Sequence, residues 1–188
     1  MSNIRIAAAP ISWGVCEVPG WGHQMDADRV LTEMASLGVE ATEFGPLGFL
    51  PEDAEGRRAT LEKHGMKAVG GFVPVVLHDP GFDPLPEVDT ELDAYVAAGA
   101  EVLVLAANTG LDGYDATRPE MREENWQAMA NNLGRISERA KERGVMAVIH
   151  PHAGTMVETW ADVQEVLTRT AIPFCLDTGH MWIGGTDP

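Results

Sequence analysis

The stretch Glu101-Val-Leu-Val-Leu-Ala-Ala107 indicates the fold most clearly, because six apolar residues follow one another without interruption. Such a short apolar run is typical of a strand that is buried on both faces of a parallel sheet. A long helical pattern follows over about residues 120–143, ends at Gly144, and gives way to the apolar run 145–149. This part of the chain therefore predicts a strand–helix–strand unit.

The same alternation extends in both directions along the chain. Strands are expected at residues 4–9, 39–44, 67–73, 101–107, 145–149 and 172–176. Helices are expected at about residues 26–37, 53–64, 89–98, 120–143 and 160–169, and a glycine follows most of them. Thr159 fits the N-cap of the last helix, with Asp162 three residues further on. Strands that alternate with helices in this way should lie parallel and be covered by the helices.

Two α/β architectures fit this alternation, an open doubly wound sheet and a (β/α)8 TIM barrel. The open sheet predicts a glycine-rich phosphate loop, yet no expected strand end has the spacing G-x-G-x-x-G or G-x-x-x-x-G-K-[ST]. The strand ends carry polar and aromatic residues instead: Ser12, Trp13, Glu43, His78, Asp79, Asn108, His150, His152, Asp177 and His180. Polar side chains at the carboxyl ends of many strands are typical of a barrel active site, so we favour the barrel.

The chain has too few predicted strands to complete this barrel. Six strands do not close an eight-stranded sheet, and the fold takes ~250 residues. The interpretation is a single TIM-barrel domain over residues 1–188, truncated on its C-terminal side. Strands seven and eight, and the helix after strand six, are then missing, so two sheet edges would be exposed.

The composition limits the classes of function. The chain has 188 residues, with 13 Lys and Arg against 29 Asp and Glu, and a formal charge of −16. This charge argues against a nucleic-acid partner, which requires clustered positive side chains. No apolar run approaches the ~18 residues of a membrane span, so we expect no membrane partner. Cys16 and Cys175 lie far apart without C-x-x-C spacing, which favours a reduced, cytoplasmic location.

The segment Asp177-Thr-Gly-His180 directly follows the apolar run 172–176. A carboxylate at the mouth of a barrel is costly to desolvate unless a partner such as a divalent cation neutralises it. The alternative is that Asp177 caps the following turn through its own backbone, as Asp often does.

His150-Pro-His152 follows the neighbouring predicted strand. Residues two apart on an extended segment face the same side, so both imidazoles can point into the barrel mouth. Imidazole nitrogen together with carboxylate oxygen suits a transition metal better than calcium. The two histidines beside a strand-end Asp-x-x-His therefore favour a metal or catalytic cluster over isolated structural histidines.

Several further residues have two interpretations each. Glu158 is either a metal ligand that reaches back or a charge at a helix entry. Glu43 is either a base or a group that binds a substrate hydroxyl, or else part of a surface loop. Trp13 and Trp182 suit stacking on a sugar or polyol ring, or else cover the barrel mouth. Asn108 is a further strand-end candidate for binding substrate.

The chain resembles the sugar phosphate isomerase/epimerase superfamily, the xylose isomerase-like TIM barrels. The motifs that carry the resemblance are Ala9-Pro-Ile-Ser-Trp-Gly14, His150-Pro-His-Ala-Gly-Thr155 with Val157-Glu-Thr159, and Leu176-Asp-Thr-Gly-His180 with Gly184-Gly-Thr-Asp-Pro188. The last motif is shared across the superfamily. The segment His-Pro-His-x-Gly-Thr is most similar to the inosose dehydratase branch.

The resemblance implies a divalent metal, manganese or cobalt first, with zinc and magnesium as alternatives. It implies that Asp177 is a ligand, that His180 contacts the substrate, and that His150 stands where most relatives have a glutamate ligand. His152 matches a family histidine, and either His150 or Glu158 completes this part of the site. The other two family ligands lie on strands seven and eight, so the chain as written is expected to bind metal poorly.

The predicted function is metal-dependent dehydration of a cyclic polyol ketone. A metal-bound carbonyl acidifies the neighbouring C–H group, and an acid or base then moves the proton. His152 and Glu43 are the predicted catalytic residues, His150, Asp177 and Glu158 the metal ligands, and Trp13, Asn108, His180 and Trp182 the substrate contacts. Alternatives are a keto-sugar isomerase or epimerase, and an inactive barrel fragment or interaction module. The expected partner is a small polyol or keto-sugar, and a homo-oligomer is left open.

Overall fold

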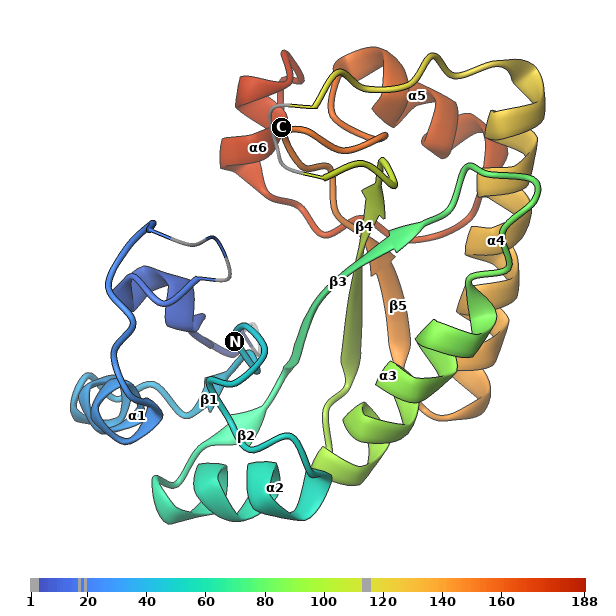
Figure 1. Cartoon of the computed structure of the whole chain (residues 1–188). Coiled ribbons are helices and arrows are strands. Elements are labelled where there is room, and N and C mark those ends of the chain that lie inside the picture. The colour runs from blue at the N-terminus through green and yellow to red at the C-terminus, as the bar shows by residue number, and fades with distance from the viewer. Residues whose placement is uncertain (1–3, 17, 19, 113–115) are drawn as a thin grey trace. The chain divides into compact units, whose positions relative to one another are not determined.

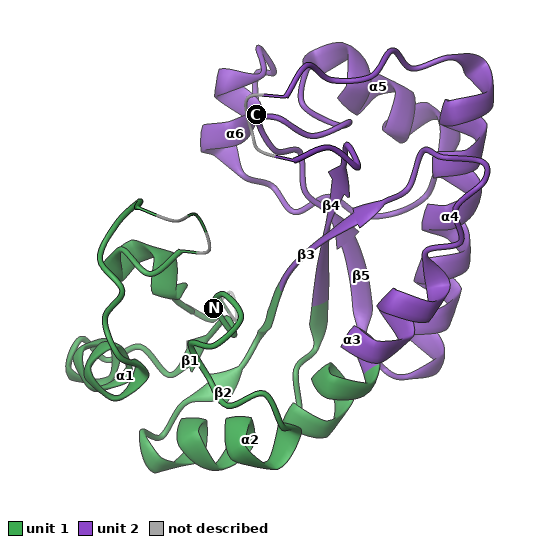
Figure 2. Ribbon diagram, in the orientation of Figure 1, with its two compact units in different colours: residues 1–71, 93–102 green, residues 72–92, 103–188 purple. Residues whose placement is uncertain are grey.

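The computed structural model describes residues 4–16, 18, 20–112 and 116–188. The chain forms two compact units (Figure 2). Unit 1 contains residues 1–71 and 93–102, and unit 2 contains residues 72–92 and 103–188. Each unit has buried apolar side chains of its own.

Unit 1 consists of short helices and a two-stranded parallel sheet (Figure 1). Its elements are the 3-10 helix η1 (Pro10–Trp13), α1 (Ala27–Ser36), β1 (Ala41–Thr42), α2 (Ala54–Lys63) and β2 (Lys67–Ala68). Asp26 and Asp53 begin α1 and α2, where their carboxylates accept hydrogen bonds from the N–H groups of Arg29 and Gly56. These caps satisfy N–H groups that the first helical turn leaves without a backbone partner.

Helices α1 and α2 contribute part of the interior of unit 1. Buried side chains on them are Val30, Leu31, Met34 and Leu61. The rings of Phe44 and Tyr95 add an edge-to-face contact with centroids 5.0 Å apart. Such pairs prefer this geometry because the positive ring edge meets the negative ring face.

Unit 2 holds most of a three-stranded sheet with the order β3-β4-β5. The elements are β3 (Gly70–Val76), α3 (Leu85–Ala98), β4 (Val102–Asn108), α4 (Glu123–Glu142), β5 (Met146–Ile149), α5 (Trp160–Arg169) and α6 (Thr178–Ile183). Among these, β3, α3 and β4 each have a part in unit 1. A helix connects each strand of this sheet to the next, which is the connection that parallel neighbours need.

The core of unit 2 lies between α4 and the sheet, and α4 runs beside β5 (Figure 1). The buried residues of α4 lie three or four positions apart, except for one adjacent pair, and are Trp126, Met129, Asn132, Leu133, Ile136 and Ala140. This spacing places them on one face of the helix. The sheet contributes the buried residues Leu103, Val104, Leu105, Ala106 and Ala107 of β4. The run that indicated the fold is therefore a buried strand, as predicted.

The predicted strands of unit 1 are shorter than expected. Residues 4–9 form no strand, and Ala8 makes a single parallel bridge to Thr42, so that prediction is wrong. Of the strand predicted at 39–44, only the two residues of β1 form a strand. The strand predicted at 67–73 is divided at Val69, whose N–H donates to Thr42 while its carbonyl accepts from both Glu101 and Val102. The chain changes its pairing partner at Val69, which explains the division.

The strand predicted at 172–176 is reduced to one parallel bridge between Phe174 and Ile149. Pro173 accounts for much of this difference, because proline has no N–H group to donate to β5. The expectation that no helix follows is also wrong, since α6 begins directly after Asp177. The remaining helix predictions hold to within a few residues, and α3 begins earlier, at Leu85.

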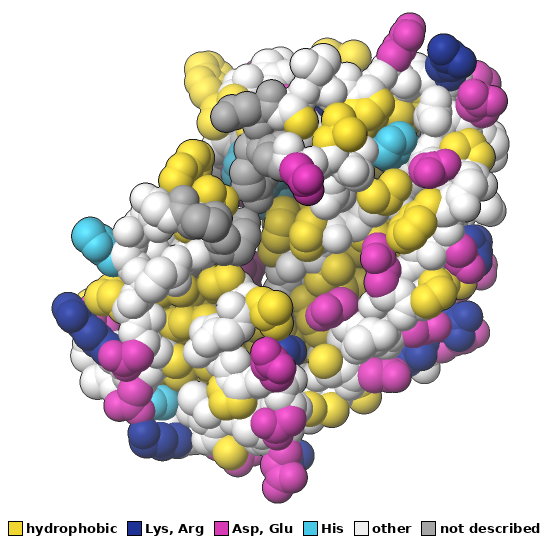
Figure 3. All heavy atoms as spheres, in the orientation of Figure 1, with side chains coloured by type: hydrophobic (Ala, Val, Ile, Leu, Met, Phe, Trp, Pro, Cys, Tyr) yellow, Lys and Arg dark blue, Asp and Glu magenta, His cyan; other side chains and the backbone are white. Residues whose placement is uncertain are grey.

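The α/β class and the alternation of strands and helices are confirmed. The described strands form a two-stranded and a three-stranded sheet and do not close into a barrel, as expected for fewer than eight strands. None of the helices in the described part of the chain has the length and hydropathy of a membrane span. On the face shown in Figure 3, Lys and Arg side chains lie among Asp and Glu side chains.

The packing of α4 predicts the effect of a cavity in unit 2. Leu133 is 0% exposed, so Leu133→Ala should lower the free energy of unfolding by about 2–5 kcal/mol. Leu167→Ala is the matched control, because Leu167 is 52% exposed and should change stability by less than about 1 kcal/mol. Urea unfolding followed by circular dichroism measures both. Equal effects of the two substitutions would contradict this packing.

Candidate active site

The end of β5 brings the first predicted site residue to the edge of the sheet. The N–H of His150 donates to the carbonyl of Leu105 in β4 at 2.8 Å. One residue earlier, the carbonyl of Ile149 accepts from the N–H of Cys175 at 2.8 Å. His150 is thus held between β4 and the segment 172–176, and its side chain is only 12% exposed.

Three imidazoles meet at this edge. One ring nitrogen from each of His150, His152 and His180 lies within 4.8 Å of the others. Nε2 of His150 is 3.3 Å from Nδ1 of His180. The rings of His152 and His180 have centroids 4.0 Å apart and an interplanar angle of 31°. The sequence predicted that His150 and His152 face the same side beside Asp177-x-x-His180, with His180 as a substrate contact, and in the structure all three rings lie together.

Asp177 caps the following helix, which is one of the two roles that the sequence left open, and its second oxygen faces two of the imidazoles. Its Oδ1 accepts from the backbone N–H of His180 at 2.8 Å and so caps α6. Its Oδ2 lies 3.1 Å from Nδ1 of His180 and 3.7 Å from Nε2 of His150. Burial alone would raise the pKa of Asp177. The hydrogen bonds from His180 and the charges of His180 and His150 outweigh burial and lower this pKa, so the carboxylate is ionised at neutral pH.

The protonation of His150 is set by its surroundings. Burial lowers the pKa of His150 to about 4, with a further lowering by His152 and His180 and an opposing effect of Asp177. The ring is therefore neutral at pH 7 and keeps a nitrogen lone pair. A neutral imidazole is the form that binds a metal ion or accepts a proton.

The orientation of His152 is fixed by its own loop. Nδ1 of His152 lies 2.7 Å from the carbonyl oxygen of Ala153. Because a carbonyl only accepts, Nδ1 carries the proton and the lone pair of the neutral ring is on Nε2. A ring N–H that donates to a backbone carbonyl is the usual second contact of a metal-binding histidine.

Phe72 closes one side of the cluster, and the sequence gave no signal for it. Its ring centroid lies 5.9 Å from that of His150 and 5.4 Å from that of His152. Phe72 lies in β3, two strands away from the histidines in the sheet order. An apolar ring at this place limits hydration of the imidazoles, in keeping with the low pKa of His150.

The other predicted residues of unit 2 lie as follows. Oε2 of Glu158 accepts from the N–H of Gly154 at 3.2 Å, so this carboxylate helps to shape the loop after β5. Oδ1 of Asn108, at the end of β4, accepts from the N–H of Gly110 at 2.9 Å. Trp182 is in α6, and its side chain is exposed.

Trp13 and Glu43 belong to unit 1. Nε1 of Trp13 donates to Glu33 at 2.9 Å. Glu43 follows β1, and burial raises the pKa of its carboxyl group. A raised pKa favours the protonated acid and is compatible with the predicted role in proton transfer.

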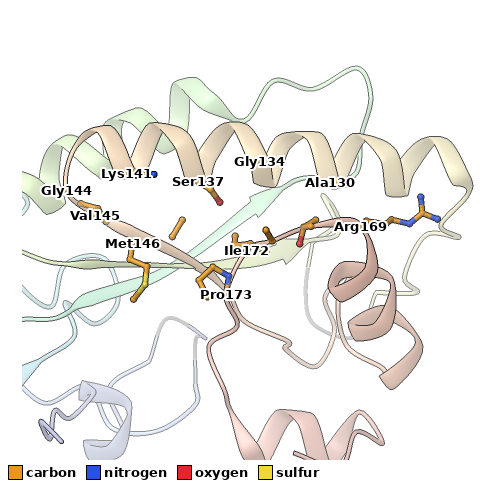
Figure 4. Close-up of a pocket in the computed structure, with 13 residues that line it drawn as sticks. Ala130, Gly134, Ser137, Lys141, Gly144, Val145, Met146, Arg169, Ile172 and Pro173 are labelled. Carbon is orange, nitrogen blue, oxygen red and sulfur yellow. The ribbon is translucent and has the colours of Figure 1, made fainter. Parts of the chain in front are cut away.

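A hollow of about 720 Å³ lies beside α4 and contains none of the predicted site residues (Figure 4). Its lining includes Gly134 and Ser137 of α4, Val145 just before β5, and Ile172 and Pro173. Val145 precedes β5, and Ile172 and Pro173 precede the bridge residue Phe174. The hollow therefore lies toward the amino ends of these two paired segments. In α/β barrels, the residues of that face contribute to stability, whereas catalysis uses the carboxyl ends.

Comparison with known proteins identifies the family. The sequence profile of the family described as xylose isomerase-like TIM barrel matches residues 31–188. The chain belongs to this family. The fold predicted from the strand ends is thereby confirmed.

Curated relatives of the family cover the whole chain. An inosose dehydratase of Geobacillus kaustophilus (strain HTA426) is 31% identical over 100% of this chain and 64% of that protein. The rhizopine catabolism protein MocC of Rhizobium meliloti is 29% identical over 100% of this chain and 60% of that protein. An inosose dehydratase of Lacticaseibacillus casei is 28% identical over 99% of this chain and 65% of that protein. The chain therefore spans less than two thirds of the length of these relatives.

Solved structures are similar in fold. The structure of an L-ribulose 3-epimerase has a TM-score of 0.70 and 15% identity, and covers 97% of this chain and 63% of its own. A probable 3-DHS dehydratase from Bacillus anthracis has a TM-score of 0.67 and 14% identity, with 98% and 67% covered. At this level of identity the likeness establishes the fold.

The depressed pKa of His150 predicts a dependence of stability on pH. The folded protein keeps this ring neutral down to about pH 4, whereas the unfolded chain binds the proton near pH 6.5. The stability contribution is complete above pH 6.5 and is lost as the pH falls toward 4. Between pH 7 and 4.5, metal-free wild type should lose about 2 kcal/mol more unfolding free energy than His150→Gln. Urea unfolding with a chelator present measures this difference, and equal losses would contradict it.

Proposed function

We propose that the chain carries the site of a metal-dependent hydro-lyase that dehydrates a cyclic polyol ketone, as in the inosose dehydratases. The observation that carries this proposal is the meeting of His150, His152 and His180 with Asp177 beyond β5. The family membership and the curated relatives named inosose dehydratase support the choice of reaction class. The two kinds of evidence are independent, because the cluster follows from geometry alone.

The donor set fits a divalent transition metal. Neutral imidazoles offer borderline-soft nitrogen donors, and Asp177 offers a charged oxygen next to two of them. His150, His180 and Asp177 would hold the ion, with His152 beside them. A nitrogen-rich set of this kind favours cobalt or zinc over magnesium. The bound ion supplies Lewis acidity, which makes the C–H group next to a ketone carbonyl easier to deprotonate.

His152 is the residue that we assign to proton transfer. Its Nε2 lone pair can accept the proton from the carbon next to the carbonyl. Its Nδ1–H stays on the carbonyl of Ala153, which stabilises the imidazolium that forms. The same proton can then pass to the departing hydroxyl group. The substrate thereby loses one molecule of water and His152 returns to its starting state.

The roles of the remaining residues follow from their contacts. Phe72 limits the access of water to His150 and His152. The exposed indole of Trp182 in α6 is available to stack on a polyol ring. Glu158, which bonds Gly154, is assigned to the shape of the loop. The small polyol or keto-sugar substrate is proposed from the curated relatives, and the charge of −16 argues against a nucleic-acid partner.

The function is tested by turnover of an inosose with the 188-residue chain, freed of metal and reloaded with Co²⁺. Loss of water is detected by mass spectrometry of the product. His152→Gln should lower the rate by at least ~100-fold, since general acid–base catalysis contributes about this much. His23→Gln is the control, because His23 is an exposed histidine of unit 1 and should leave the rate within ~2-fold.

Three outcomes would contradict the proposal. No water loss by the wild-type chain would favour a fragment or interaction module. Interconversion of sugars without water loss would favour the isomerase or epimerase alternative. Unchanged dehydration by His152→Gln would remove His152 from the reaction.

A further inference from the structure

We propose that Arg118 is a positioning residue for this site, because its guanidinium fixes the loop 152–159 on which His152 is carried. The inference rests on the proposed function only in taking His152 as a member of the site. Arg118 lies between β4 and α4, whereas the loop follows β5. The contact therefore joins two successive loops at the same end of the sheet.

The backbone of His152 is held on both sides by its own loop. Its N–H donates to the carbonyl of Val157 at 3.0 Å. Its carbonyl accepts from the N–H of Thr155 at 3.2 Å and from the hydroxyl of Thr155 at 2.8 Å. The direction of the His152 ring therefore depends on where Thr155 and Val157 are held.

Arg118 and Asp162 hold these residues. Nη1 of Arg118 donates to the carbonyl of Thr155 at 3.3 Å and to Oδ2 of Asp162 at 2.5 Å. The same Oδ2 accepts from the N–H groups of Glu158 at 3.2 Å and Thr159 at 2.8 Å. Both ends of the segment from Thr155 to Thr159 are thus fixed to one ion pair.

This arrangement exceeds what a helix cap requires. The capping box of α5 needs only Thr159 and Asp162, whose side chains each accept from the other residue's backbone N–H. The bonds from Glu158 and Arg118 are additional to it. Asp162 has a side chain that is only 8% exposed, and a carboxylate in such a place needs a positive partner. The cation is supplied from the preceding loop.

The loop has one further attachment that is independent of Arg118. The N–H of Met156 donates to the carbonyl of Ala107 at the end of β4, at 2.7 Å. Loss of Arg118 should therefore loosen the loop without detaching it. The expected consequence is a less well-defined direction of His152. Because the ring of His152 packs on that of His180 with centroids 4.0 Å apart, the proposed ligand His180 loses an outer contact, and the metal should bind more weakly.

The matched control is a second partly buried ion pair of unit 2. Nη1 of Arg143 lies 3.0 Å from Oδ1 of Asp89, with side chains 25% and 29% exposed. Arg118 and Asp162 are 30% and 8% exposed. Arg143 follows α4 at the other end of that helix. A general loss of stability should therefore appear in both variants, and a positioning effect only in the Arg118 variant.

The experiment compares Arg118→Met, Arg118→Lys and Arg143→Met by two measurements. The first is amide hydrogen exchange at His152 and Thr155 in metal-free protein. The second is the affinity for Co²⁺, measured by calorimetry. In Arg118→Met the two amides should exchange at least ~10-fold faster, and Co²⁺ should bind about 10-fold more weakly. Arg118→Lys should restore part of the amide protection and part of the Co²⁺ affinity. Arg143→Met should leave the exchange rates and the Co²⁺ affinity within about 2-fold of wild type.

Each failure has a distinct meaning. Exchange at His152 and Thr155 that stays at the wild-type rate in Arg118→Met would overturn the positioning role, whether or not metal binds. Faster exchange confined to the first turn of α5 would reduce Arg118 to a support of the helix cap and would also overturn it. Faster exchange in Arg118→Met, combined with wild-type protein that binds no Co²⁺, would refute the proposed function and leave the positioning role supported.

Discussion

The close approach of His150, His152 and His180 is the constraint on which the site depends. Their ring nitrogens lie within 4.8 Å of one another, and a charge on one ring makes protonation of its neighbours more costly. Burial beside Phe72 adds to this cost at His150. The ionised Asp177 acts in the opposite direction and attracts positive charge to the same place. A cluster of imidazole nitrogens next to a carboxylate offers the donors that a divalent transition-metal ion binds.

The fold produces this constraint through the ends of its strands. β4 and the segment 172–176 hold the end of β5 on either side, which places His150 at the edge of the sheet. The single bridge at Phe174 brings Asp177 next to that edge, and α6 begins there. Asp177 both caps this helix and turns His180 toward the other rings. One carboxylate thus connects the backbone geometry with the chemistry of the cluster.

The sequence predicted the parts that follow from local patterns. Residue type and spacing indicated the apolar run of β4, the helices and their caps, and the pairing of His150 with His152. It could not predict Phe72 or Arg118, because their contacts join segments far apart in the chain and neither lies in a recognisable motif. The strand predicted at 4–9 was wrong, since the segment pairs with β1 only at Ala8, and Ile4 and Ile6 are 80% and 73% exposed. The sequence placed Asp177-x-x-His180 beside the two histidines and expected His180 to contact the substrate, but the contact of its ring with those of His150 and His152 depends on the direction of α6, which no pattern indicated.

The central claim is that imidazole nitrogens of this cluster bind a metal ion. X-ray absorption of the zinc-loaded 188-residue chain tests it most directly, because imidazole rings give a characteristic outer-shell scattering. We predict a first shell at about 2.0–2.1 Å that contains two or more imidazole nitrogens together with carboxylate oxygen. The imidazole signal should weaken in His150→Gln and remain in His23→Gln. A first shell of oxygen alone, or a spectrum unchanged by His150→Gln, would contradict the account.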